Sequence, residues 1–368
     1  MRGLLITKNF KEKVLDGGEY INKRNKEILE ACCTELDIIE IDKKVYNNQI
    51  EKLKNMVINK NFYGISLNEK KYIMQVLEKK RYDFCFIASS LIGCLVKDLK
   101  IAYPNLKIIV FFHNVEYIYY KQLAKQSGIY KLILAFFAKY NEKLSIKWAD
   151  KIISLNERDA NNISKIYDRK IDLIIPTSFK DIYVNREKNN VSNSNSRNYI
   201  NLLFVGSDFY ANYQGIEWFI KNVLPYLNNV TLNIVGKGTE RWKLSFKNID
   251  NLNILGTVES LDMYYFEADA VILPIFLGSG MKTKTAEALM YGKYILGTKE
   301  AFEGYELDYE KVGALCNNKE EYIYAINNII KKYNNKYNEY SREIFEKKYS
   351  NDIWIDYLKK FLEKSLCL

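Results

Sequence analysis

The chain has 368 residues, 48% hydrophobic and 27% charged, so at about 100 to 200 residues per domain it predicts two globular domains and excludes a disordered tail or a single small module. A formal net charge of +10 favours polyanionic partners, namely nucleic acid, an anionic membrane surface or phosphorylated small molecules, without choosing among them. The single histidine, His113, excludes multi-histidine metal sites and argues against protein-bound zinc chemistry.

The first half of the chain alternates short apolar runs with polar helical stretches. We expect strands at Leu4–Thr7, Ile38–Ile41, Phe84–Ala88, Ile108–Phe112, Ile152–Leu155 and Leu173–Ile175. This alternation requires a parallel sheet with helices on both faces. Because the start leads into a strand rather than a signal peptide, and no apolar run reaches the ~20 residues of a membrane span, we expect a cytoplasmic protein with reduced cysteines.

A lysine-rich helix is expected within the stretch from Tyr117 to Lys151. Its lysines recur every four residues at Lys139, Lys143, Lys147 and Lys151. They would form one stripe beside the apolar run 132–137 if the helix extends that far, although Ile152 should already begin a strand. Such a stripe suits an anionic membrane surface, and the alternative is a solvated face of a core helix.

An Asn- and Ser-rich segment separates two halves of similar pattern. We assign residues 185–199 to a linker or exposed loop, residues 1–184 to a first domain and residues 200–350 to a second. In the second domain we expect strands at Leu202–Val205, Leu232–Val235, Leu252–Leu255, Ala270–Leu273 and Tyr294–Leu296. The chain ends in an amphipathic helix at Asn351–Leu366. Doubly wound domains bind ligands at the carboxyl ends of their strands, facing a cleft.

A glycine-rich loop, Gly278-Ser279-Gly280, opens a predicted helix after the buried strand Ala270–Leu273. Free N–H groups and the positive helix end suit a phosphate group, and Lys282 and Lys284 add cations. Glu287 lies three residues after Lys284, where its carboxylate can accept two hydrogen bonds from a ribose diol. The alternative is a solvated helix with a Lys284–Glu287 surface pair, because the loop is neither a Walker A loop nor a GxGxxG motif.

Longer stretches carry a family resemblance. In the second domain these are Leu202–Phe219, Leu232–Gly238, Leu255–Thr298 and Phe302–Leu307, and in the first domain Gly17-Gly18, HNVE at His113, Glu142, Ala149–Asp159 and Ile175-Pro176. Together they resemble glycosyltransferase family four, the retaining nucleotide-sugar enzymes of the GT-B fold. The resemblance implies an α/β fold of two doubly wound Rossmann-like domains facing a cleft, with the helix in 351–368 crossing back to the first domain.

The same resemblance implies roles for individual residues. The donor-binding set would be Gly17, Gly18, Ser207, Gly278, Ser279, Gly280, Met281 and Glu287, with Glu287 on the donor ribose. The catalytic set would be His113, Lys282 and Lys284, with His113 against the transferred sugar and the lysines at the diphosphate.

The chain departs from the family pattern at two places. Family members often carry two glutamates, and Ser279 stands in place of the first; Ser207 and Asn212 stand near where many members have Arg and Lys.

Plainer interpretations exist for several of these motifs. Gly17-Gly18 could be a simple strand-to-helix turn, and His113 a structural residue after a buried strand. We interpret Gly236-Lys237-Gly238 as a turn that borders the cleft and Glu267-Ala268-Asp269 as a helix-to-strand junction rather than a metal motif. We therefore predict no essential metal and no cofactor.

We predict a metal-independent hexosyltransferase. It would move a sugar from a nucleoside diphosphate donor, with a UDP-sugar preferred, to a glycan, lipid-linked or protein-linked acceptor, with retention implied by the resemblance. It would be cytoplasmic, with peripheral contact to an anionic membrane. The alternative is a non-catalytic accessory subunit of the same fold. A nucleic-acid-binding protein lacks a recognisable motif here, and an oxidoreductase would need a GxGxxG after the first strand.

Overall fold

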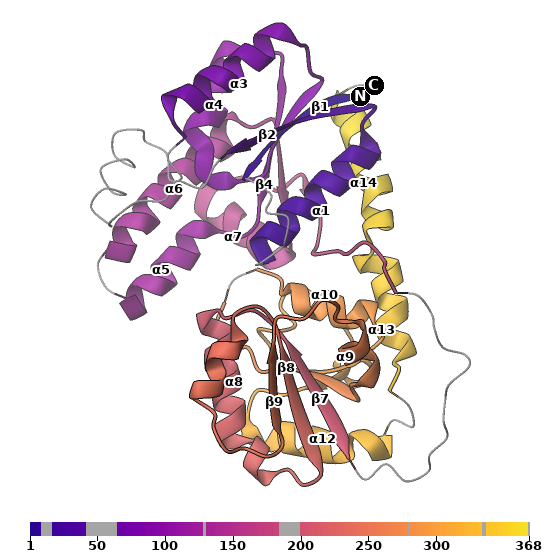
Figure 1. Cartoon of the computed structure of the whole chain (residues 1–368). Helices are drawn as coiled ribbons and strands as arrows, with labels where there is room; N and C mark the ends of the chain where they lie inside the picture. The colour runs from indigo at the N-terminus through magenta and orange to yellow at the C-terminus, as the bar shows by residue number, and fades with distance from the viewer. Residues whose placement is uncertain are drawn as a thin grey trace. The chain divides into compact units, whose positions relative to one another are not determined.

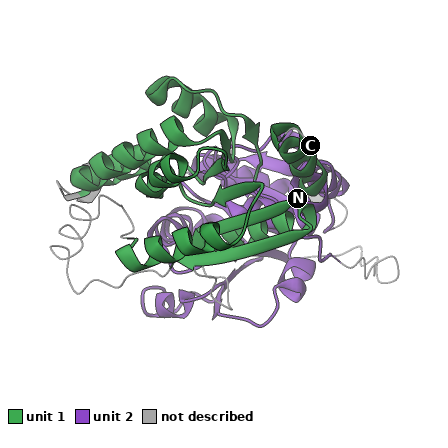
Figure 2. Ribbon diagram, turned by 90° about the horizontal axis from the view of Figure 1, so that it is seen from above, with its two compact units in different colours: residues 1–176, 354–368 green, residues 177–353 purple. Residues whose placement is uncertain are grey.

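The computed structural model describes residues 1–8, 17–41, 65–127, 130–183, 199–278, 280–332 and 336–366. It divides the chain into two compact units, Met1–Pro176 with Trp354–Leu368, and Thr177–Ile353 (Figure 1; Figure 2). Residues 177–183, which we assigned to the first domain, therefore group with the second unit. The predicted linker 185–199 lies, except for Tyr199, outside the described residues.

Within its described residues, the first unit contains a parallel sheet in the order β2-β1-β3-β4-β5-β6. Its strands are β1 (Arg2–Lys8), β2 (Glu35–Ile41), β3 (Phe84–Ile87), β4 (Lys107–Phe112), β5 (Lys151–Ser154) and β6 (Leu173–Ile174). Its helices are α1 (Gly17–Cys32), α3 (Leu67–Lys79), the 3-10 turn η1 (Ser90–Ile92), α4 (Gly93–Ala102), α5 (Glu116–Ser127), α6 (Tyr130–Trp148), α7 (Glu157–Tyr167) and most of α14 (Asn351–Leu366). Each strand predicted for this half is found.

The second unit repeats this architecture in the order β12-β11-β10-β7-β8-β9, again among described residues. Its strands are β7 (Ile200–Val205), β8 (Val230–Val235), β9 (Leu252–Gly256), β10 (Ala270–Leu273), β11 (Tyr294–Gly297) and β12 (Gly313–Leu315). Its helices are α8 (Tyr210–Asn222), α9 (Asp262–Glu267), α10 (Thr283–Met290), α11 (Tyr309–Val312), α12 (Lys319–Lys332) and α13 (Glu339–Ile344), with 3-10 turns η2 (Leu224–Tyr226) and η3 (Thr239–Leu244) and a π-helical turn η4 (Phe345–Tyr349). The doubly wound α/β prediction is confirmed. Strand β12 was not predicted, because three residues beginning with glycine give no apolar run.

The central strands form because their sequences are apolar on both faces, as expected for strands covered by helices on either side, whereas the edge strands β2 and β9 expose some of their residues. Every side chain of Ile108–Phe112 in β4 and of Ala270–Leu273 in β10 is buried. In the first unit, Ile73 of α3 and Leu95 of α4 join the strand side chains in one core. The C-terminal helix buries Leu358 and Leu362, so the amphipathic pattern of its sequence is used for packing.

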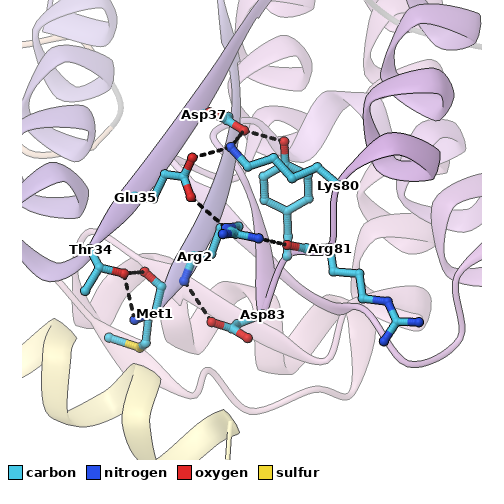
Figure 3. Close-up of polar contacts among 9 residues, drawn as sticks. Met1, Arg2, Thr34, Glu35, Asp37, Lys80, Arg81 and Asp83 are labelled. Carbon is cyan, nitrogen blue, oxygen red and sulfur yellow. Dashed lines mark hydrogen bonds and ion pairs between the residues drawn. The ribbon is translucent and has the colours of Figure 1, made fainter.

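Ion pairs tie the amino ends of the first sheet together (Figure 3). Arg2 of β1 pairs with Glu35 of β2 at 2.7 Å, and Lys80 contacts Glu35 at 2.5 Å and also Asp37. The backbone N–H of Arg2 donates to Asp83 at 2.7 Å. These groups are largely solvated, so they add little stability. They lie at the amino edge of the sheet, opposite to the edge that carries the predicted site residues.

The order of strands reverses once in each sheet. In the first unit, β1 is followed in the chain by β2 on one side and, later, by β3 on the other; in the second unit β7 has β8 and β10 on its two sides. A reversal of this kind opens a crevice at the carboxyl ends of the two adjacent strands. It places the Ser207 loop after β7 beside the Gly278–Gly280 loop after β10.

Helix α8 can approach β10 because of one glycine. A Cβ built on Gly215 would lie 1.8 Å from the carbonyl oxygen of Pro274, which follows β10. No side chain fits at that distance, so Gly215 sets how closely α8 packs against the end of β10. Since α8 carries Asn212, the same contact fixes one residue of the candidate site.

We expect Gly215→Ala to lower the free energy of unfolding by about 1 to 3 kcal/mol, because overpacking outweighs the gain in helix propensity. Urea denaturation measures the change, and Gln214→Ala, on the same helix, serves as the control with a smaller effect. An unchanged or higher stability of the Gly215 variant would mean that α8 can move away from Pro274 at no cost.

Candidate functional site

The centre of the candidate site is a chain of hydrogen bonds that joins β7, α8 and α10. The amide of Asn212 donates to the backbone carbonyl of Ser207 at 2.9 Å, and its carbonyl oxygen accepts from Nζ of Lys284 at 2.8 Å. Asn212 is buried, and Lys284 is partly buried, with Nζ 5.8 Å from the ring centroid of Phe204. Ser207 and Lys284 therefore both contact Asn212, and their role in binding a donor stays a prediction.

Burial makes Lys284 an unusual lysine. Desolvation lowers its pKa to about 7; the nearby charge of Lys282 lowers it further and Glu287 opposes the shift. Near neutral pH the ammonium is therefore only partly populated. An anion placed beside it would favour the protonated form, so ligand binding and protonation are coupled at this position.

Glu287 lies one turn further along α10. Its Oε2 accepts a hydrogen bond of 2.9 Å from the hydroxyl of Tyr265, a fully buried residue of α9 whose ring stacks on Tyr291 at 4.2 Å. Desolvation raises the pKa of Glu287 to about 7, against the smaller opposing effects of the Tyr265 bond and of Lys284. The surface pair that we considered as an alternative does not describe this carboxylate, because it is partly buried and held by an aromatic hydroxyl.

Lys282 is held differently from Lys284. It is 9% exposed, and its Nζ donates to the Gly280 carbonyl at 2.7 Å and contacts Glu300 at 2.7 Å. Gly278 has a φ of +151° and Gly280 a φ of +67°, values that favour glycine. The amine of Lys282 is thus satisfied within the protein, which makes Lys282 a loop-stabilising cation and Lys284 the better candidate for binding an anion.

Two other members of the predicted donor set belong to the same loop. Ser279 lies outside the described residues. Met281 is 7% exposed, and its sulfur accepts the backbone N–H of Thr177 at 3.5 Å. The side chain of Met281 therefore serves packing within the second unit.

A close backbone approach shapes the neighbouring loop. A Cβ on Gly236, after β8, would lie 2.1 Å from the carbonyl oxygen of Gly206, after β7. Gly236 and Gly238 both have positive φ, and the backbone N–H of Asp208 donates to the Lys237 carbonyl at 2.8 Å. The Gly236-Lys237-Gly238 segment is therefore a turn, as predicted, and it supports the loop that carries Ser207.

The first unit places its predicted residues at the carboxyl edge of its own sheet. Gly17 and Gly18 form the exposed start of α1, where the N–H groups of the first turn have no partners within the helix. His113 follows β4, and its ring meets that of Phe111 edge-on at 5.3 Å. Burial lowers the pKa of His113 to about 3, assisted by the charges of Lys8 and Arg24. The imidazole is therefore neutral near pH 7.

The acidic triplet Glu267-Ala268-Asp269 is structural. Helix α9 ends at Glu267, β10 begins at Ala270, and Asp269 accepts the backbone N–H of Asn201 at 2.8 Å. This confirms the predicted helix-to-strand junction. Among the described residues, no group of three or more His, Cys, Asp or Glu side chains is arranged to hold a metal ion.

Residues 200–332, which include every described member of the second-unit site, match the family described as glycosyl transferases group 1. The match lies wholly within the second unit, Thr177–Ile353. No curated protein sequence matches the chain significantly.

Solved glycosyltransferase structures resemble the whole chain. Sucrose-phosphate synthase (tll1590) from Thermosynechococcus elongatus has a TM-score of 0.77 and 14% identity, over 99% of this chain and 98% of that one. Anabaena Alr3699/HepE, solved in complex with UDP, has a TM-score of 0.66 and 13% identity, over 99% of this chain and 100% of that one. WaaG, a glycosyltransferase involved in lipopolysaccharide biosynthesis, has a TM-score of 0.62 and 14% identity, over 96% and 99%. At these identities the likeness establishes the fold, which is GT-B.

Sequence reasoning missed two residues of this candidate site. Tyr265 reaches Glu287 across 22 positions, and Glu300 reaches Lys282 across 18. No local spacing signals such pairs. The first pair meets where Tyr265 of α9 stacks on Tyr291, at the end of α10.

The two perturbed groups predict how nucleotide binding depends on pH. As pH falls below about 7, Glu287 gains a proton and loses its charge; as pH rises above about 7, Lys284 loses its proton. Affinity for UDP, measured by calorimetry, should therefore be greatest near neutral pH. Glu287→Gln should flatten the acid limb and Lys284→Met the alkaline limb.

Comparison between variants is needed because a phosphate group itself titrates near about 6. Lys284→Arg, which keeps its charge at all these pH values, is the control and should extend tight binding into the alkaline range. Parallel curves for the wild type and all three variants would remove Lys284 and Glu287 from the nucleotide site.

Proposed function

We propose that this chain is a retaining glycosyltransferase that uses a nucleoside diphosphate sugar, with UDP-sugars preferred, and needs no metal ion. The observation that carries the proposal is the pairing of a partly buried carboxylate, Glu287, with a partly buried amine, Lys284, one turn apart on α10 beside the Ser207 loop. A carboxylate that accepts two hydroxyl groups and a cation suited to phosphate are the two halves of a nucleotide site. Structurally similar Anabaena HepE was solved with UDP and with UDP-glucose, which supports the choice of base.

In this proposal Glu287 accepts hydrogen bonds from the donor ribose. Lys284, together with the first-turn N–H groups of α10, faces the diphosphate and stabilises the negative charge that develops as the sugar departs. In the first unit, the N–H groups of Gly17 and Gly18 are a second set of donors for an anion. Neutral His113 would accept a hydrogen bond from a hydroxyl of the transferred sugar.

Positioning and charge would supply the catalysis. The diphosphate leaves, the acceptor hydroxyl attacks from the same face, and the departing phosphate oxygen takes the acceptor proton. The protein then needs no nucleophile of its own. Glycan, lipid-linked and protein-linked acceptors all present such a hydroxyl.

The test is a thermal-shift panel of nucleoside diphosphates and their sugars, followed by transfer assays with and without a chelator. A ligand at ~100 times its dissociation constant adds about 2.7 kcal/mol of stability. Glu287→Ala should bind UDP about 10- to 100-fold more weakly, because a hydrogen bond to a charged acceptor contributes about 1.5 to 3 kcal/mol.

Glu310→Ala, at an exposed position of the same unit, is the matched control and should leave the UDP response unchanged. A flat response of the wild type to every nucleotide would refute the proposal. Nucleotide binding without transfer or donor hydrolysis would instead identify the accessory subunit.

A second element of the proposal is contact with an anionic membrane through α6. Leu132, Phe136 and Tyr140 are 50%, 67% and 41% exposed on this helix, at i, i+4 spacing. Lys139, Lys143 and Lys147 are also exposed on it. Lys151 does not belong to this stripe. Helix α6 ends at Trp148, and Lys151 begins β5 and pairs with Asp172 at 3.0 Å. In the described residues, no helix is both long enough and apolar enough to cross a membrane.

Replacement of Lys139, Lys143 and Lys147 by Gln should weaken binding to anionic vesicles about 100-fold, because each lysine near the surface contributes about 1 kcal/mol. Co-sedimentation at low salt measures it. The control replaces Lys311, Lys347 and Lys360, which are exposed elsewhere, and removes the same charge. Equal losses in both triple variants would reduce the effect to net charge, and no binding by the wild type would exclude the contact.

A further inference from the structure

The buried face of α1 changes character along its length. Toward the C-terminal end it presents Ile28, Leu29 and Cys32, which pack in the core. In the N-terminal half the buried residues include Asn22, Arg24 and Asn25, which are 4%, 1% and 4% exposed. In a strand-helix-strand unit the start of the helix lies near the carboxyl edge of the sheet. The polar half of α1 therefore lies at the edge where ligands bind.

Arg24 is the central residue of this polar face. Its Nη1 donates to the carbonyl of Pro176 at 2.9 Å, and the guanidinium carbon lies 5.4 Å from the ring centroid of Phe111. Among the described residues, Nε and Nη2 have no hydrogen-bond partner. These two atoms form one edge of the guanidinium, the fork that binds a carboxylate or phosphate through two parallel hydrogen bonds.

Neighbouring polar atoms are unsatisfied too. In the described part of the chain, Nδ2 of Asn25, Oδ1 of Asn22, Oγ1 of Thr7 and Nε2 of His113 also lack hydrogen-bond partners. Thr7 lies near the end of β1, and His113 packs on the same Phe111 ring as Arg24. Arg24 and Lys8 also act electrostatically on His113, which places two positive charges near one neutral imidazole.

Burying polar groups without hydrogen-bond partners costs free energy of folding. A buried donor without a partner costs about 1 to 3 kcal/mol, and more when it is charged. A buried cation is normally paired, and a cluster of unsatisfied groups in a native fold indicates a missing ion, water or ligand. Because the free edge of Arg24 carries two N–H donors and a positive charge, the occupant that satisfies it best is an oxyanion.

We propose that Arg24, with Asn25 beside it, binds an oxyanion of the acceptor, a phosphate or carboxylate on the molecule that receives the sugar. This inference rests on the proposed function. Asn22 and Thr7 would then accept or exchange hydrogen bonds with hydroxyl groups of the same molecule, whereas Nε2 of His113 remains available for the transferred sugar. The acceptor class is thus an anionic sugar or polyol rather than a neutral one.

The test uses the full-length protein with saturating UDP, so that the nucleotide site is filled. The probes are inorganic phosphate, glucose 6-phosphate, glucuronate and glucose, followed by thermal shift and calorimetry. We expect stabilisation by at least one of the oxyanion compounds and none by glucose, with the affinity reduced at least 10-fold in Arg24→Gln. Lys23→Gln, an exposed neighbour on α1 that removes the same charge, should keep the wild-type affinity.

Other outcomes would overturn the assignment. If UDP abolishes phosphate binding to the wild type, the oxyanion site belongs to the donor. If Arg24→Gln keeps the anion affinity, or if no anion binds the wild type, Arg24 is a structural residue. Should Arg24→Gln fail to fold, Arg24→Lys keeps the charge without the fork and must still lose affinity. A response of the wild type to UDP tests the proposed function separately.

Discussion

The reversal of strand order between β7 and β10 is the constraint on which the second-unit site depends. At this reversal the chain leaves two adjacent strands in opposite directions, which opens a crevice at their carboxyl ends. The loops that follow these strands carry Ser207 and Gly278. Glycines then let the backbone close around this point. Because Gly215 has no side chain, α8 packs directly against the Pro274 carbonyl. In the same way, Gly236 lets the turn after β8 pack against the Gly206 carbonyl. Side chains at these positions would collide with the two carbonyls, which adjoin the segments that carry Asn212 and Ser207.

Burial at that crevice sets the chemistry of the charged residues. Desolvation shifts Lys284 down and Glu287 up, so both pKa values come to about 7. Near neutral pH neither charge is therefore fully developed, and under the proposed function a ligand with a diphosphate and a diol would favour both charged forms. Lys282 shows the contrast: it lies two residues away, yet Glu300 and the Gly280 carbonyl already satisfy its amine. Two lysines that are equivalent in the sequence thus differ because one is paired within the protein.

The sequence predicts the strands and the two-domain organisation well because parallel strands covered on both faces must be apolar runs, which are visible without an alignment. It also predicts that Lys284 and Glu287 lie on one helix, since that helix follows a buried strand and a glycine loop, and their role as donor ligands stays a prediction. Contacts across long separations were not predictable. Tyr265 has an ordinary sequence neighbourhood, and its contact with Glu287 follows from the packing of α9 on α10. The predicted stripe of four lysines includes Lys151 because the spacing by four continues past the end of the helix. Lys151 is instead the first residue of β5.

The carboxyl edges of the two sheets differ in how far their charged groups are already paired within the protein. In the second unit, each described buried charge at the crevice has a polar partner: Asn212 for Lys284, Tyr265 for Glu287 and Glu300 for Lys282. In the first unit, Arg24 keeps one edge of its guanidinium unpaired among the described residues, and His113 keeps Nε2 unpaired as well. A site whose groups are already paired can exchange those partners for a common ligand that many enzymes share. A site with unpaired groups gains most from a ligand whose charge and hydroxyl pattern match it, so under the proposed function the first unit would carry the selectivity for the acceptor.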